Sequence, residues 1–413
     1  MQVVYQRCCG IDVHKETAVA CVLTTQTDGT VQREVRTLRT MTGALEVLSQ
    51  WLREHAVEQV AMESTGVFWQ PVFNILEEGG HAVLLVNPQH MRAVPGRKTD
   101  VADSVWLADL LRHGLLRASF IPPAPIRHLR ALTRYRATLV QERAQEINRL
   151  QKVLESANIK LAAVATNILG VSGQLMLHAL AEGTEQDPAV LAELAKGKLR
   201  KKLTLLRQAL EGRVKPHHRL LIARFLDHIA GLSEAVEQIE GEIAQSVLPF
   251  AQEMALLQTI VGIKQTAAAA ILAEIGADMS RFPDAKHLAS WAGVCPGNRT
   301  SAGKSKGSAT TNGDVWLRGI LGEVAWAAIR TKGTSFQAQY QRLVRRLGKL
   351  KALVAVMHSL LTVIYCVLRN RVAYHELGPD YLGPQEAERR TRQHIRRLEE
   401  LGYTVTLAPK EVA

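Results

Sequence analysis

The sequence predicts an α/β domain with a mixed sheet, followed by an all-helical remainder. Residues 1 to about 120 alternate between strand-like and helix-like hydrophobic periods, whereas the chain beyond them has almost only helical periods. A proline cluster at residues 121–125 (IPPAP) separates the two patterns, because clustered prolines cannot continue a helix and form a stiff linker. We therefore expect one α/β domain (1–120), a helical arm (121–250), a helical C-terminal domain (251–375) and a tail (376–413).

In the first domain, three strands precede an alternation of helices and strands. The predicted strands are GIDVHK, TAVACVLTT, QREVRTL, VEQVAMES and HAVLLVN. TGALEVLSQWLREH has helical spacing, with Leu45, Leu48 and Leu52 on one face. FWQPVFNILEEGG and DVADSVWLADLLRHG predict two further helices, the second of which ends at Gly114. This order is typical of an α/β domain with a mixed sheet.

Residues 121–250 predict two long helices with coiled-coil spacing. Apolar residues recur at or near heptad steps in two stretches: Leu132, Leu139, Ile147, Leu150 and Leu154, then Phe225, Ile229, Leu232, Val236, Ile239 and Ile243. We expect an antiparallel hairpin or a dimerisation arm. The segment between the helices holds KGKLRKK (196–202) and VKPHHR (214–219). Such charge runs are usually solvated helix faces, and contact with nucleic acid is the alternative.

The C-terminal domain contains a short motif that could hold a phosphate. LLQTIVGIKQTAAAAILAEIG (256–276) resembles a helix-hairpin-helix, whose backbone N–H groups near Gly262 and Lys264 would bind a DNA phosphate without reading sequence. An alanine-rich helix that only packs tightly is the alternative. Further on, the apolar stretch 353–368 falls short of the roughly 20 residues that a membrane span needs. We predict that it is a buried helix and expect no membrane partner. The Arg- and Glu-rich residues 376–413 predict a peripheral tail.

Composition narrows the class of protein. Apolar residues make up 47% of the chain and charged residues 22%, which is typical of a folded protein. Lys and Arg number 51 against 39 Asp and Glu, and the resulting net charge of +12 suits a polyanionic partner. Five cysteines without CxxC spacing argue against a disulfide framework or a zinc site and for a reducing cytosol. The N-terminus lacks the apolar core of a signal peptide, so we expect a cytoplasmic protein of the cytosol or nucleoid.

Four carboxylates fall where they could converge on a metal. Asp12 lies inside the first strand among apolar residues, and Glu63 ends the fourth. Asp100 and Asp103 stand three residues apart at the start of a helix, on adjoining parts of one face. Taken singly, Asp100 could be an ordinary N-cap, Asp103 a favourable acidic residue in the first turn of the helix, and Glu63 a lysine partner. Together they favour a site for Mg²⁺, with two ions about 4 Å apart for phosphodiester chemistry.

The segment between Pro296 and Asp314 is rich in glycine, lysine and hydroxyl groups. Its composition predicts a mobile, cationic surface loop that can approach a phosphate backbone closely. Spacing alone does not rank Ser301, Ser305 and Ser308 as nucleophiles.

Both regions resemble one known family. GIDVHK, MESTGVFW, LLVNPQH and VPGRKTDVADSVWLADLLRHGLL are similar to the N-terminal domain of insertion-sequence-110 family transposases, which has the RNase H-like fold in its RuvC-like form. The resemblance places the Asp-Glu-Asp-Asp quartet of that family on Asp12, Glu63, Asp100 and Asp103. WAGVCPGNRTSAGK is similar to the C-terminal domain of the same family, whose serine falls on Ser301. In all, the resemblance runs from about residue 9 to residue 375.

The resemblance implies a DNA transposase that cuts and rejoins strands. In that family the serine attacks the scissile phosphate and forms a 5′-phosphoserine link, a role that carries over to Ser301 alone. Arg299, Lys304 and Lys306 would be the nearby cations that contact phosphate. The implied partners are donor and target double-stranded DNA and a structured guide RNA encoded by the element. The heptad spacing adds a homo-oligomer, a dimer or tetramer. The serine and the carboxylates of one active site come from one subunit or from two, and we favour sites composed across subunits.

Two other functions remain open on the sequence. The first is a RuvC-like junction resolvase or nuclease that hydrolyses DNA, in which Ser301 would be only structural. The second is a nucleic-acid-binding protein without catalytic activity, in which the carboxylates would be structural remnants and Mg²⁺ would play no part.

Overall fold

The structure is a computed structural model that describes residues 2–63, 66–86, 100–296, 299–301, 304–307, 309–310, 312–379 and 383–407. Within these ranges, the backbone alone is described for residues 100–102, 299–301, 304–307, 383–390 and 393. The chain divides into two compact units, Met1–Ile121 and Pro122–Ala413. Each unit is described by itself.

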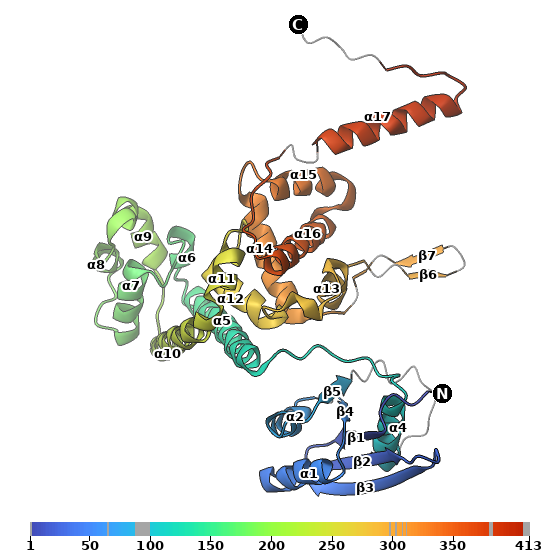
Figure 1. The fold of residues 1–413 in the computed structure, drawn as a ribbon. Coiled ribbons are helices and arrows are strands. Elements are labelled where there is room, and N and C mark those ends of the chain that lie inside the picture. The colour runs from blue at the N-terminus through green and yellow to red at the C-terminus, as the bar shows by residue number, and fades with distance from the viewer. Residues whose placement is uncertain are drawn as a thin grey trace. The chain divides into compact units, whose positions relative to one another are not determined.

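Unit 1 is built on a five-stranded mixed sheet in the order β3-β2-β1-β4-β5 (Figure 1). Its strands are β1 (Arg7–Val13), β2 (Thr17–Thr25), β3 (Val31–Arg39), β4 (Gln59–Glu63) and β5 (Val83–Val86). β1 pairs antiparallel with β2, and β2 with β3, whereas β1, β4 and β5 run parallel. The predicted mixed sheet, with three strands before the alternation, is confirmed.

Helices cover both faces of this sheet. Its helices are α1 (Thr42–Glu54), α2 (Trp69–Glu78) and α4 (Asp100–Arg112). Cys9, Ile11 and Val13 of β1 pack into the core beneath α1 and α2. Cys8 packs into a second core, on the opposite face, with residues of α4. Because side chains alternate along a strand, the even-numbered residues of β1, like Cys8, face α4.

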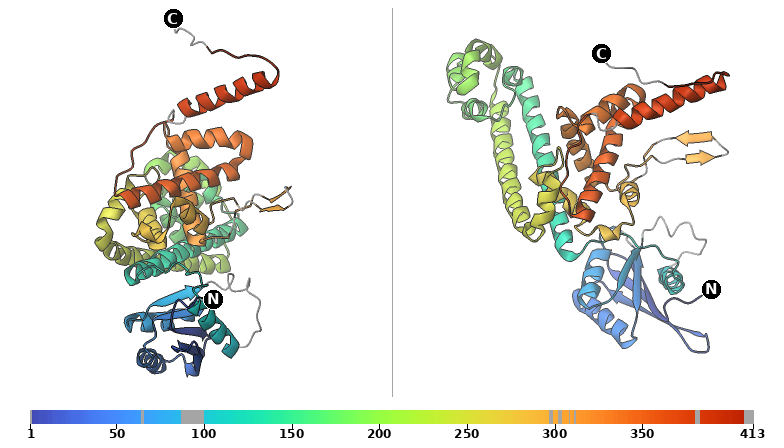
Figure 2. Two further views of the ribbon diagram at one scale, coloured as in Figure 1. Left: turned by 45° about the vertical axis from the view of Figure 1, so that its right-hand side comes forward. Right: turned by 45° about the horizontal axis from the view of Figure 1, so that its top comes forward.

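Unit 2 begins with the arm, which is an antiparallel pair of long helices, α5 (Ala124–Ser156) and α10 (Pro216–Ser246) (Figure 2). Polar contacts between the helices fix the direction. Ser156 meets His218 at 3.3 Å, and Arg136 donates to Glu240 at 2.7 Å near the other end. The predicted seam of α10 packs against α5 of the same chain, with Leu139 of α5 buried between Leu232 and Val236. The spacing is therefore satisfied within one chain by an antiparallel hairpin.

A small helical head closes the arm. It contains α6 (Leu161–Val164), α7 (Val171–Glu182), α8 (Pro188–Glu193), the 3-10 helix η1 (Gly197–Lys202) and α9 (Leu203–Leu210). Apolar residues of these helices share one core with the ends of α5 and α10. The sequence patterns did not predict this separate core, because its helices are too short to show a clear period.

The rest of unit 2 is helical, with one small hairpin. Its elements are η2 (Leu248–Phe250), α11 (Ala251–Gln258), α12 (Gln265–Ile275), η3 (Met279–Arg281), α13 (Ala285–Trp291), β6 (Arg299–Ser301), β7 (Lys304–Gly307), α14 (Val315–Arg330), α15 (Ser335–Leu347), α16 (Lys349–Asn370) and α17 (Gly383–Glu400). The segment around Ser301, predicted as a surface loop, forms an antiparallel β6–β7 ladder. The tail, predicted only as peripheral, contains the helix α17.

α16 is the predicted buried helix. Among the described residues it is the one helix long and apolar enough to cross a membrane, and half of its most apolar stretch is buried inside the domain. Val356, Leu360 and Ile364 of α16 are fully buried at steps of four residues. Tyr365 donates a hydrogen bond to the carbonyl of Phe282 at 3.2 Å. α16 is therefore the core helix around which this part of unit 2 packs, which confirms the prediction.

Candidate active site

The register of the sheet brings Asp12 and Glu63 to the same edge. Ile11 of β1 is paired with Met62 of β4 in the parallel ladder, so the residues that follow them are neighbours at the carboxyl ends of the two strands. Val60 and Met62 pack beneath α1 and α2, whereas Ala61 packs against α4. The alternation therefore directs Asp12 and Glu63 to the α4 face. Asp12 is 9% exposed.

α4 approaches this edge because β1 has no side chain at Gly10. A Cβ there would lie 2.3 Å from the carbonyl oxygen of Ser104 and 2.5 Å from the amide nitrogen of Ala108. One step earlier on the same face, the Cys8 thiol donates to the Ala108 carbonyl at 3.4 Å. α4 thus runs antiparallel to β1, and its first turn lies toward the strand ends that carry Asp12 and Glu63.

The backbone places Asp12 and Glu63 at one edge of the sheet, and α4, which begins at Asp100, packs against the same face. Asp103 is partly buried near the start of α4, and Asp100 is its first residue. The side chain of Asp100 lies outside the described residues. Among the side chains that are described, no group of three or more His, Cys, Asp and Glu is placed to hold a metal ion. The donor chemistry, all carboxylate oxygen, is what Mg²⁺ takes in proteins, and the four-ligand site stays a prediction.

His14 is a residue of this edge that the sequence reasoning missed. Its Nε2 lies 3.2 Å from Oδ2 of Asp12, whose side chain is 12% exposed against 43% for His14. The amide of His14 donates to the carbonyl of Thr17 at 2.8 Å, which fixes the turn between β1 and β2. The signal was present in GIDVHK, because residues two apart on an extended chain lie on the same side. His14 can orient the carboxylate of Asp12.

Ser301 is the last residue of β6. In the ladder it is paired with Lys304, and Thr300 with Ser305. The side chains of Ser301, Arg299, Lys304 and Lys306 lie outside the described residues, so their predicted roles remain predictions. The pairing itself places a lysine position directly opposite the candidate nucleophile.

The two segments that flank the β6–β7 hairpin are held together by backbone contacts. The amide of Asp314 donates to the carbonyl of Trp291 at 3.4 Å. Pro296 and Thr310 form an isolated antiparallel bridge. A Cβ on Gly313 would lie 2.3 Å from the amide nitrogen of Gly293, so the two backbones touch. These contacts fix the base from which the Ser301 hairpin extends.

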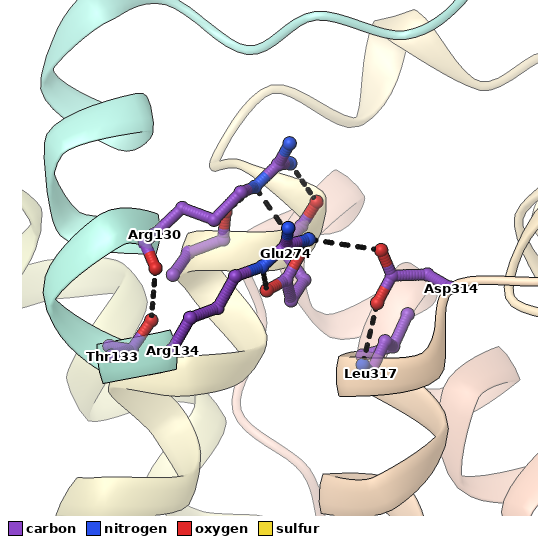
Figure 3. A network of polar contacts seen from close by, with 7 residues as sticks. Arg130, Thr133, Arg134, Glu274, Asp314 and Leu317 are labelled. Atoms are coloured by element: carbon purple, nitrogen blue, oxygen red, sulfur yellow. Dashed lines mark hydrogen bonds and ion pairs between the residues drawn. The ribbon is translucent and has the colours of Figure 1, made fainter. Parts of the chain in front are cut away.

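Asp314 also belongs to a buried ionic network (Figure 3). Glu274 of α12 is 1% exposed and accepts two hydrogen bonds from Arg134 of α5, at 2.8 and 2.7 Å. Arg130 donates to the Glu274 carbonyl at 2.6 Å. Arg134 also reaches Asp314 at 3.2 Å, and Asp314 caps α14 through the Leu317 amide at 2.7 Å. The network joins the base of the arm to α12 and to the residue that ends the serine segment.

Burial and charge act in opposite directions on the two arginines. Burial disfavours the charge of Arg134, but the hydrogen bonds and negative charge of Glu274, with Asp314, raise its pKa above the ordinary value. For Arg130 burial prevails, and the pKa is lowered despite the attraction of Glu274. Both guanidinium groups remain charged at neutral pH, since the ordinary pKa of arginine is far higher. Sequence patterns did not reveal this network.

The segment predicted as a helix-hairpin-helix forms a tightly packed turn between α11 and α12. Gly262 lies between α11 and α12 at φ +90°, and a Cβ there would lie 2.7 Å from the Val324 carbonyl of α14. Ala268 and Ala269 of α12 are buried, as the packing alternative expects. Lys264, the N-cap residue of α12, is exposed. The turn is therefore built for packing on one side, and phosphate binding at Gly262 and Lys264 stays a prediction.

Family comparisons cover both candidate regions. A transposase family defined on the DEDD domain of IS110 matches residues 9–159, which include Asp12, Glu63, Asp100 and Asp103. The family described as "Transposase IS116/IS110/IS902 family" matches residues 254–341, which include Ser301.

Curated relatives span most of the chain. It is 26% identical over 377 residues to the "Pilin gene-inverting protein" of Moraxella lacunata, covering 87% of this chain and 95% of that protein. It is 25% identical over 335 residues to the "Insertion element IS116 uncharacterized 44.8 kDa protein" of Streptomyces clavuligerus, covering 72% and 81%. Among solved structures, Thermus thermophilus RuvC matches 27% of this chain and 99% of its own at 14% identity, with a TM-score of 0.22.

Proposed function

The chain belongs to the IS110/IS116 family of transposases, and on that premise we propose that it cuts and rejoins the DNA of a mobile element with Mg²⁺ and a serine nucleophile. The observation that carries the proposal is the register that sets Asp12 beside Glu63 at the edge where α4 begins. The match of residues 254–341, which include Ser301, to a transposase family supports the proposal that this second region takes part in the reaction.

The carboxylates would form the metal-binding half. Asp12, Glu63, Asp100 and Asp103 supply only oxygen ligands, and an oxygen-rich set suits two Mg²⁺ ions. When bound, these ions neutralise charge on the phosphate and lower the barrier of phosphoryl transfer. The protein's own part is to hold the ligands in place: the sheet fixes Asp12 and Glu63, the close packing at Gly10 fixes α4, and His14 orients Asp12.

Ser301 would form the covalent half. Its Oγ attacks the scissile phosphorus, the Oγ–P bond forms, and the bond between phosphorus and the 3′ oxygen breaks. The 3′ oxygen leaves and takes up a proton, so the strand keeps a 5′ phosphate joined to the protein. A new 3′ hydroxyl then attacks the phosphoserine and releases Ser301. Because the energy of the ester is kept, joining needs no nucleotide cofactor. Arg299, Lys304 and Lys306 would stabilise the phosphate charge.

The partners follow from this reaction. We propose donor and target double-stranded DNA as substrates, a structured guide RNA encoded by the element as the source of sequence specificity, and a homo-oligomer as the active form. The protein would act in the cytosol or nucleoid, where the donor and target DNA lie. Its net charge of +12 supports polyanionic partners in general.

An adduct assay tests the proposal. Purified protein, Mg²⁺, RNA from the element's flanks and end-labelled junction DNA are combined and run on a denaturing gel, beside the Ser301→Ala and Asp103→Ala variants. We expect a protein–DNA adduct with the wild type and none with either variant. Cleavage that persists in Ser301→Ala and disappears in Asp103→Ala would instead indicate a hydrolytic resolvase. No cleavage or adduct in any sample, with DNA binding unchanged by Asp103→Ala and by Mg²⁺ removal, would indicate a binding protein without catalytic activity.

A further inference from the structure

One short segment of the arm has a large excess of positive charge. Residues 196–219 contain nine Lys and Arg and one Glu, a net charge of +8, whereas the whole chain carries +12. The preceding residues 160–195 contain one Lys and four acidic residues. A solvated helix face usually mixes both signs, as the arm helices themselves do. This segregation is therefore not explained by solubility alone.

The structure places these charges on a folded surface. Lys196 precedes η1, and Lys198 and Lys201 lie within it, all three exposed. Side chains three residues apart eclipse on a 3-10 helix, so Lys198 and Lys201 share one face. We call Lys196, Lys198 and Lys201 the head surface. None of the three forms an ion pair within the described part of the chain, whereas neighbouring Arg200 pairs with Glu193 at 3.5 Å.

The backbone beneath the head surface is fixed. The amide of Lys196 donates to the Ser172 hydroxyl at 2.8 Å. Leu199 of η1 packs against the core of the head, and Leu206 of α9 is fully buried in that core. The three lysines are thus presented by an ordered scaffold, so less conformational entropy is lost when they bind a ligand than on a disordered tail.

The composition of the head indicates which polyanion fits. Residues 157–219 contain no Phe, Tyr or Trp. Proteins that hold single-stranded nucleic acid use such rings to stack bases, so the head lacks the groups for that mode. Closely spaced lysines suit the regular phosphates of a duplex, which they bind without reading bases.

We infer that the head surface binds the phosphate backbone of double-stranded DNA. This binding site is separate from the residues of the serine hairpin that are predicted to contact phosphate. The inference rests on the proposed function only in taking DNA as the partner. The contact would add affinity and orient the arm on the duplex. It would add no sequence specificity, because the phosphate groups are the same at every base pair.

Two charge-matched variants test the inference by binding alone. Lys198→Gln/Lys201→Gln removes two charges from the head surface. Lys152→Gln/Arg224→Gln removes two exposed charges from the shaft of the same arm. Binding of the full-length protein to a short labelled duplex of unrelated sequence is followed by fluorescence anisotropy, in EDTA and at several salt concentrations. Thermal unfolding confirms that both variants fold, since all four side chains are exposed.

We expect the head variant to bind about tenfold more weakly than wild type near physiological salt, and its slope of log affinity against log salt to fall by about 2. The shaft variant should stay close to wild type. Equal affinities of the two variants for the duplex would overturn the inference. So would a head variant that binds the DNA duplex as tightly as wild type does but binds an RNA hairpin probe more weakly. If the wild type itself binds no DNA, the proposed function fails rather than the head surface alone.

Discussion

Arg134 and Glu274 form a two-bonded ion pair at 2.8 and 2.7 Å, although 140 residues separate them in the sequence. Glu274 is 1% exposed, so its charge depends on the arginines of α5 for compensation. Asp314, which Arg134 also contacts, ends the segment that carries Ser301. Arg134, at the base of the arm, therefore joins the buried carboxylate of α12 to the residue that caps α14.

Removing that carboxylate should destabilise unit 2. We expect Glu274→Ala to lower the free energy of unfolding by about 3 kcal/mol, because two arginines would lose their buried partner. Glu240→Gln is the matched control: it breaks the more exposed pair with Arg136 and should cost at most about 1 kcal/mol. Urea unfolding measures both. Similar midpoints for the two variants would mean that the network does not hold the domain together.

The contact between β1 and α4 predicts a second difference between matched variants. Gly10→Ala puts a methyl group 2.3 Å from the Ser104 carbonyl and should displace α4 from the sheet, at a cost of about 3 kcal/mol. Gly43→Ala, in the first turn of α1, meets nothing within 4 Å and should change stability by less than about 0.5 kcal/mol. Thermal unfolding and DNA cleavage are the measurements. Full activity in Gly10→Ala would show that the position of α4 is not important for the site.

Asp12 and His14 should differ in their dependence on Mg²⁺. Asp12→Asn removes a proposed ligand charge and should lower cleavage by about 1000-fold at any Mg²⁺ concentration. His14→Ala removes a group that orients the ligand and should raise the Mg²⁺ concentration for half-maximal cleavage by about tenfold, with the rate restored at saturation. Titration of Mg²⁺ after chelation separates the two effects. An unchanged requirement in His14→Ala would leave the contact at 3.2 Å without a role.

Three of the five cysteines should be inert in the folded protein. Cys8, Cys9 and Cys21 are buried, whereas Cys295 is partly exposed and Cys366 is exposed. Burial raises the pKa of Cys8 to about 12 and that of Cys21 to about 11, from an ordinary value of 9.0. Because the thiolate is the reactive form, a thiol reagent near pH 8 should modify only Cys295 and Cys366 until the protein is unfolded.

The same shifts give a direction for stability against pH. The folded pKa of Cys8 and Cys21 lies above the unfolded value of 9.0, so their contribution is complete below pH 9 and is lost as the pH rises toward 11 and 12. Unfolding of Cys8→Ala/Cys21→Ala should therefore change less between pH 9 and 11 than unfolding of the wild type. A steeper decline in the variant would contradict the assignment to these thiols.

The carboxylate edge could be predicted because its causes are local. A charged residue at the end of an apolar strand is visible in GIDVHK and in VAMES, and strand order follows from the alternation of periods. The register that makes Asp12 and Glu63 neighbours needed the structure, since a shift of one residue would have turned one of them to the other face.

The support of the serine segment could not be predicted, because its contacts join distant parts of the chain. Glu274 sits in an alanine-rich helix with no polar pattern around it, and its partners lie at the start of the arm. The β6–β7 ladder was also missed, since glycine and lysine weaken strand propensity and composition indicated a loop. The resemblance to a family selected Ser301 where spacing did not.

The most direct test of the central claim is to identify the residue that carries DNA. The adduct is trapped, the DNA is digested by nuclease and the protein by trypsin, and the peptides are read by mass spectrometry. Cleavage after Arg299, Lys304 and Lys306 places Ser301, Ser305 and Ser308 in three different peptides. We predict a nucleotide on the peptide TSAGK, which holds Ser301. A nucleotide on either other peptide, or free 5′ phosphates without any modified peptide, would contradict the mechanism.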